Sequence, residues 1–107
     1  MGEYIVVFCT CPDLDVSEKI ANHLVENKIA ACVNITSKIN SVYFWQGVVE
    51  RDTEYLLIIK TKSKLFEKLE NEIKSLHPYT VPEIIAMPVI LGSKDYLNWI
   101  DETVNLD

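Results

Sequence analysis

The sequence predicts an α/β sandwich of the ferredoxin-like type, in which helices pack on one face of an antiparallel sheet. Its 107 residues provide for one domain, spanning 1–107, because domains commonly hold 50–250 residues. Apolar and β-branched runs alternate with segments whose apolar residues recur at helical spacing. Their order, β-α-β-β-α-β with a C-terminal helix, is that of two split β-α-β units.

The first unit is predicted from a buried strand, a capped helix and a second strand. Residues 4–9 form a continuous run of aromatic and β-branched side chains, which is typical of a strand. Asp15 and Glu18 have the spacing of a capping box, so we expect a helix over about 16–28. Residues 30–35 then form the second strand.

A hairpin is predicted to lead into the second unit. Residues 41–45 are aromatic and β-branched and must be extended. The pair 46–47 and the charged residues 50–52 favour a bend with a bulge. Residues 55–60 then return as a long central strand.

The second helix, the last strand and a terminal helix complete the chain. Ser63 is predicted to cap the second helix, and Pro78 ends it because the residue before a proline disfavours helical backbone. Residues 83–91 form the last strand, in which Pro88 indicates an edge position. A short helix is predicted over 94–104.

Both faces of the predicted strands are apolar, which is unusual for a two-layer sandwich. In residues 4–9, 41–45 and 55–60, apolar side chains occupy successive positions and not every second one. Since helices cover one face only, an open face would show polar residues. We therefore expect a second subunit to cover this face. The alternative is that the terminal helix folds back across it with Tyr96 and Trp99.

Composition excludes several classes of partner. The net charge is −6 and no basic cluster is present, so a nucleic-acid partner is not expected. No stretch approaches the ~18 apolar residues of a membrane span, so no membrane role is expected. Three cysteines do not form a closed disulfide set, which favours a reduced, cytoplasmic protein.

The motifs of common enzymes are missing from the sequence. With three glycines there is no phosphate-binding loop, and no nucleophile elbow or zinc-protease motif occurs. We therefore expect a protein that is not an enzyme. An acid–base enzyme that uses His77 and Glu83 is the least favoured alternative.

Soft metal ligands are the chemistry that remains. Cys9 and Cys11 are separated by one residue at a strand end, so both thiols could point the same way, and His77 follows a helix at a proline corner. Thiolates and imidazole suit copper and zinc. The alternative is that the cysteines are small buried hydrophobes. Cys32 is expected in the core, and His23 on a solvated flank.

Two further groups of residues have alternative interpretations. The segment 77–83 holds two prolines and brings His77 and Glu83 close in sequence, either as an acid–base or ligand cluster or as a rigid connector. The connector is favoured. Tyr43 and Trp45 suit ligand stacking, although contact with a partner is the favoured role.

Five sequence blocks together resemble the CutA family of divalent-cation tolerance proteins. They recur in the right order along nearly the whole chain, and their joint occurrence is highly specific. The blocks are Ala30-Ala31-Cys32-Val33-Asn34-Ile35, Ser41-x-Tyr43-x-Trp45-x-Gly47, Ile59-Lys60-Thr61, His77-Pro78-Tyr79-x-x-Pro82-Glu83 and Tyr96-Leu97-x-Trp99.

The resemblance implies a homotrimer of ferredoxin-like subunits similar to PII signalling proteins, cytoplasmic residence and a link to copper and other divalent metals. In bacterial members it implies a copper site made by a cysteine at the end of the first strand and two adjacent histidines. Cys9 and His77 fall on two of these positions, whereas Leu76 stands at the first histidine. Water, Cys11 or a neighbouring subunit would complete the shell.

Two functions follow from the resemblance and the residues together. The first is a trimeric copper-binding protein of metal tolerance, with Cys9 and His77 as ligands and Cys11 as a weaker candidate. The alternative is a PII-like small-molecule sensor or interaction scaffold, which binds a small polar metabolite between subunits. Its cleft would be lined by Trp45, Lys60, Tyr79 and Glu83.

Overall fold

The structure, a computed structural model, describes residues 3–104. These described residues form five strands and three α-helices, together with a single 3-10 turn, η1. In chain order they are β1 (Tyr4–Cys11), α1 (Leu14–Glu26), β2 (Cys32–Ile35), β3 (Ile39–Trp45), β4 (Val48–Lys62), η1 (Ser63–Leu65), α2 (Phe66–Leu76), β5 (Ile85–Pro88) and α3 (Lys94–Thr103). None of the helices in this described part is long and apolar enough to cross a membrane.

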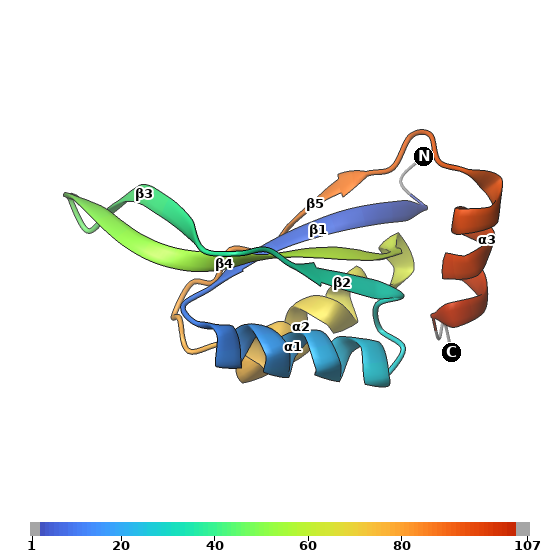
Figure 1. The fold of residues 1–107 in the computed structure, drawn as a ribbon, viewed down its shortest axis with the longest axis horizontal. Coiled ribbons are helices and arrows are strands. Elements are labelled where there is room, and N and C mark those ends of the chain that lie inside the picture. Colours follow the sequence, from blue (N-terminus) through green and yellow to red (C-terminus); the bar gives the residue numbers. More distant parts are fainter. Residues whose placement is uncertain (1–2, 105–107) are drawn as a thin grey trace.

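One antiparallel sheet with the order β2-β4-β1-β5 forms the body of the protein, and β3 pairs with the outer part of β4. Helices α1 and α2 lie together on one face of this sheet (Figure 1). The predicted ferredoxin-like sandwich is confirmed. Pro88 does lie in an edge strand, but β5 is shorter than expected, with four residues.

The two main helices begin differently from the prediction. Helix α1 starts at Leu14, because the Asp13 side chain accepts a hydrogen bond from the Val16 N–H at 2.8 Å and caps it. The predicted capping box at Asp15 was therefore wrong. Ser63 does not cap α2 either: it opens η1, and α2 follows without a side-chain cap.

The hairpin turn is tighter than predicted. Gln46 and Gly47 both have positive φ, 50° and 81°, which is the pattern of a two-residue turn that matches the twist of the strands. The charged residues 50–52 are therefore not in a bend but within β4, which has 15 residues. They lie on an arm that projects beyond the body of the sheet, where solvent reaches both faces (Figure 1).

The core lies between the sheet and the two helices. Odd-numbered residues of β1 face the helices and are buried, together with the apolar stripes of α1 and α2. Cys32 was expected in this core and is instead half-buried on the opposite face, where its Sγ lies 4.0 Å from Lys60 Nζ. His23 lies on a helix flank as predicted, and pairs with Glu72 at 2.5 Å.

The other face of the sheet, here called the open face, carries six apolar side chains from three strands. They are Val6, Phe8, Leu56, Ile58, Ile85 and Met87. Helix α3 does not cover them. It packs at the end of the sheet (Figure 1), where Ile100 and Val104 contact Ala31 and Leu65. The alternative, a helix folded across the face, is therefore wrong.

Candidate metal site

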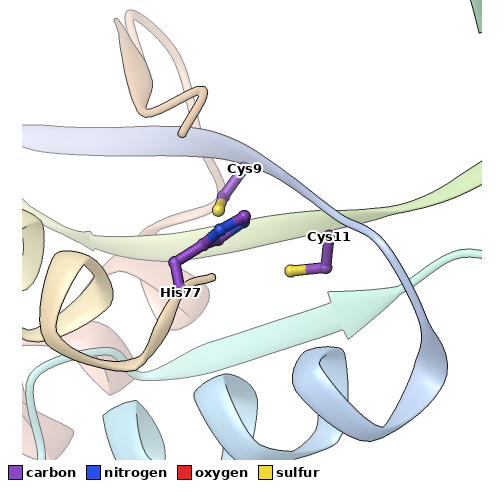
Figure 2. A group of neighbouring side chains, drawn as sticks. All are labelled: Cys9, Cys11 and His77. Atoms are coloured by element: carbon purple, nitrogen blue, oxygen red, sulfur yellow. The ribbon is translucent and has the colours of Figure 1, made fainter. Parts of the chain in front are cut away.

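Three soft donor side chains converge at the end of β1. Cys9 and Cys11 lie two residues apart in the strand, so both point to the helix side of the sheet. His77 follows the last residue of α2, and its ring lies beside the two thiols (Figure 2). The sulfur and ring nitrogen atoms all lie within 4.8 Å of one another, and all three residues are buried.

Backbone atoms hold the ring of His77 at both of its nitrogens. Nε2 lies 2.7 Å from the carbonyl oxygen of Thr10, and the N–H of Tyr79 donates to Nδ1 at 3.1 Å. Because Nδ1 accepts, Nε2 carries the proton and donates to Thr10, which describes a neutral imidazole. The extended backbone of His77, φ −89° and ψ 135°, is that expected before Pro78.

The two thiols of Cys9 and Cys11 differ in acidity. The hydrogen bond from Cys9 lowers the pKa of Cys11 to about 5 against the opposing effect of burial, and His77 and Ser17 contribute in the same direction. The same bond, together with burial, raises the pKa of Cys9. Cys11 is therefore the more acidic thiol of the pair, and a thiolate is the form that binds metal.

Burial and hydrogen bonding shift the pKa of His77 in opposite directions. Burial lowers the pKa of the imidazole, but the Cys11 side chain and the Thr10 carbonyl oxygen outweigh burial and raise it. Leu76, which stands at the first histidine position of the resemblance, provides no ligand and packs against the hydrophobic core. The site thus offers two sulfurs and one nitrogen, a set suited to copper(I) and zinc.

A second feature is a pocket between the β3–β4 arm and the loop after α2. It has a volume of about 690 Å³. Of the four residues predicted to line a cleft between subunits, Trp45, Tyr79 and Glu83 line this pocket, which lies within one chain. Lys60 does not, because its ammonium group bonds to Asn34 on the open face. The cleft between subunits stays a prediction.

Sequence reasoning missed the buried carboxylate of this pocket. Glu54 is only 6% exposed, and its Oε2 accepts a hydrogen bond of 2.9 Å from the Tyr79 hydroxyl. Burial and this bond raise the pKa of Tyr79. The sequence contains one indication that Glu54 is buried, which is its position directly before the apolar run 55–59. The suggested acid–base pair of His77 and Glu83 is not formed, since both nitrogens of His77 bond to backbone atoms.

Comparison with known proteins identifies the family. Residues 5–103 match the family described as CutA1 divalent ion tolerance protein. The chain belongs to the CutA family. This confirms the resemblance inferred from the five sequence blocks.

Three CutA proteins are similar to this chain over nearly their whole length. The divalent-cation tolerance protein CutA of Thermus thermophilus is 50% identical over 97 residues, which are 91% of this chain and 94% of that protein. The solved CutA1 of Oryza sativa has a TM-score of 0.95 at 41% identity and covers 98% of this chain and 96% of its own. The periplasmic divalent cation tolerance protein CutA of Archaeoglobus fulgidus has a TM-score of 0.92 at 44% identity, with 95% and 99% covered.

Proposed function

We propose that this CutA protein acts in metal tolerance as a copper-binding homotrimer, and that Cys9, Cys11 and His77 hold the metal. The observation that supports the proposal is the convergence of two sulfurs and one imidazole nitrogen within 4.8 Å in a buried site. The names of the CutA relatives, which are those of divalent-cation tolerance proteins and not of enzymes, agree with it. Its role would be buffering or signalling and not turnover.

The donor set fits a soft metal ion. Cys11 is the more acidic of the two thiols, and Nδ1 of His77 accepts a hydrogen bond, so the site can present the thiolate and the imidazole nitrogen that ligate metals. In this proposal Cys11 replaces one metal ligand, because Leu76 and not a histidine stands at the first histidine position of the resemblance. Binding has one structural cost, because a nitrogen of His77 must first give up its bond to Thr10 or Tyr79.

A copper(I) titration against a chelator of known affinity, under reducing conditions, tests the site. We expect the wild-type protein to compete, and Cys9→Ser, Cys11→Ser and His77→Ala each to lose at least about tenfold in affinity, or ~1.4 kcal/mol. Cys32→Ser is the matched control, since Cys32 lies outside the group of three donors on the other face. A wild type that does not compete, or a Cys32→Ser variant as weak as the others, contradicts the proposal.

The homotrimer is supported by apolar surface that the single chain leaves uncovered. The open face carries Ile85 and Met87, which are 54% and 40% exposed, beside four further apolar side chains. Monomeric proteins rarely leave so continuous an apolar patch in water. The number of three subunits comes from the resemblance to PII-like assemblies. Light scattering on a sizing column tests it, and a monomer of 12.3 kDa would contradict it.

The proposal also includes the cytoplasm as the compartment. All three cysteines are free, and thiolate ligands require reducing conditions. The Archaeoglobus fulgidus relative is named a periplasmic protein. Cell fractionation with an antibody to this chain decides the point, and recovery from the periplasm alone would overturn this part.

A second candidate function is that of a PII-like small-molecule sensor or scaffold. The observation in its favour is the pocket of about 690 Å³, a size typical of ligand sites. A thermal-shift screen of metabolites separates the two functions. A compound that stabilises Cys9→Ser and His77→Ala as much as the wild type supports the sensor.

A further inference from the structure

The pocket beside the β3–β4 arm contains a buried carboxylate without a cationic partner. Glu54 lines the pocket, is 6% exposed and accepts a hydrogen bond from the neutral Tyr79 hydroxyl. Within residues 3–104, no lysine, arginine or histidine lies within 4.0 Å of it. Removing a carboxylate from water without an opposite charge costs several kcal/mol. A cation that enters the pocket would offset this cost.

The walls of the pocket are suited to the same kind of ligand. Three aromatic side chains line it, from Tyr43, Trp45 and Tyr79, and the faces of such rings attract cations. Hydroxyl groups of Ser41 and Thr10 can accept hydrogen bonds from an N–H group. Neither lysine nor arginine is present among the described lining residues. The pocket therefore disfavours an anionic ligand, because the described residues of its lining hold carboxylates and no lysine or arginine that could pair with the anion.

A second carboxylate lies at the rim. Glu83 is exposed and lines the pocket, in a protein whose net charge is −6. Negative charge at the mouth of a cleft raises the local concentration of cations. Val42 and Val81, which are 55% and 67% exposed, add apolar surface to the wall. The ligand should therefore combine a positive charge with an apolar body.

We propose that this pocket binds a small organic ammonium compound, with its N–H groups donating to Glu54 and its apolar part against Trp45 and Val81. The inference rests on the second candidate function above and names the chemical class of its ligand. Its test can be separated from that of the copper site, because neither Cys9 nor Cys11 lines the pocket, although Thr10 and Tyr79 line it and also hold His77.

Three probes that share a phenyl ring on a short chain and differ in charge separate the effect of charge from that of shape. They are 2-phenylethylammonium, the neutral 2-phenylethanol and the anionic 3-phenylpropanoate, each titrated by calorimetry into the wild-type protein in its native assembly. We expect the ammonium compound to bind at least about tenfold more tightly than either of the others, a difference of ~1.4 kcal/mol. This order of affinities is measured on the wild type and does not depend on a variant that folds.

The variant Glu54→Gln keeps a hydrogen-bond acceptor for Tyr79 and removes the charge. It should weaken the ammonium compound at least about tenfold and leave 2-phenylethanol unchanged. Glu102→Gln, the same change at an exposed position of α3, should have no effect. Cys9→Ser should also bind like the wild type.

The other outcomes overturn the inference in distinguishable ways. If 2-phenylethanol or 3-phenylpropanoate binds as tightly as the ammonium compound, the pocket takes a ligand but not an organic cation, and the sensor function survives. If none of the probes binds at millimolar concentration, both the inference and the sensor function fail. An ammonium affinity unchanged in Glu54→Gln also contradicts the inference, because the charge would then lie elsewhere.

Discussion

The imidazole Nε2 of His77 lies 2.7 Å from the carbonyl oxygen of Thr10, so the end of α2 is bonded to the end of β1. Thr10 stands between Cys9 and Cys11, and this one bond places the ring next to both thiols. The same imidazole therefore has a structural role in the metal-free protein and a ligand role in the proposed complex. Fold stability and copper affinity depend on one side chain.

Replacement of His77 by alanine should destabilise the fold as well as the metal site. The change removes the imidazole from the Thr10 carbonyl oxygen and opens a cavity where a residue with 8% exposure now packs. We expect a loss of about 2–4 kcal/mol in the free energy of unfolding, measured with urea. His23→Ala, which breaks a surface pair with Glu72, should cost less than about 1 kcal/mol. Equal losses in the two variants would contradict the structural role of His77.

Cys9 and Cys11 should resist alkylation in the native protein although Cys11 has a pKa of about 5. Both side chains have 0% exposure, and a reagent cannot reach a buried thiolate. Treatment with iodoacetamide followed by peptide mass spectrometry should find both unmodified in the folded state and modified in denaturant. Rapid labelling of Cys11 in the native protein would show that the site opens.

Docking of α3 should depend on pH through Asp101. The carboxylate accepts bonds from Lys62 and Tyr4, and these partners hold its pKa below the usual 3.8. A depressed pKa gives stability that is present above pH 3.8 and is lost as the pH falls through the folded-state value. The variant Asp101→Asn should therefore melt at a lower temperature than the wild type near neutral pH.

The difference in melting temperature between the two proteins should disappear in acid, below the folded-state pKa of Asp101. Thermal unfolding followed by circular dichroism between about pH 7 and pH 2 measures it. Glu102→Gln, one residue further along the same helix, is the control and should melt like the wild type at every pH. A constant difference for Asp101→Asn would assign the effect to packing and not to charge.

Local patterns in the sequence were sufficient to predict the architecture. Continuous apolar runs, helical spacings and Pro88 in the last strand depend on residues near one another in the chain. The errors concern backbone details: the two-residue turn at Gln46 and Gly47 depends on positive φ at both residues, and residues 50–52 then belong to a strand. A run of charged residues is incompatible with a strand buried in the body of a sheet, and it therefore indicates a loop there. On an arm that solvent reaches from both sides, the same run can form a strand.

The candidate site was predictable only where it depends on residues that are close in the chain. The spacing of Cys9 and Cys11 in a strand places both thiols on one face, which is a local property. Their meeting with His77 depends on how the end of α2 reaches β1 across the fold. The burial of Glu54 was not predicted, because a single carboxylate in a strand is normally solvated and its hydrogen-bond partner, Tyr79, lies in the loop after α2, far along the chain.

The β3–β4 arm gives the sharpest test of the proposed assembly. Phe44 is 73% exposed and pairs across the turn with Val49, which is 58% exposed. In an isolated chain, Phe44→Asp would change stability by no more than about 0.5 kcal/mol, as surface substitutions usually do. If other subunits cover the arm, the same change buries a charge in an apolar interface.

We therefore expect Phe44→Asp to convert an assembly of about three times 12.3 kDa into smaller species, or to lower its melting temperature by ten degrees or more, roughly the effect of a few kcal/mol. Light scattering and thermal melting measure the two outcomes. Val25→Asp is the matched control, because Val25 is 40% exposed on α1, on the opposite side of the sheet from the open face. An assembly that tolerates Phe44→Asp as well as Val25→Asp would exclude the arm from the interface, and the apolar open face alone would have to hold the subunits together.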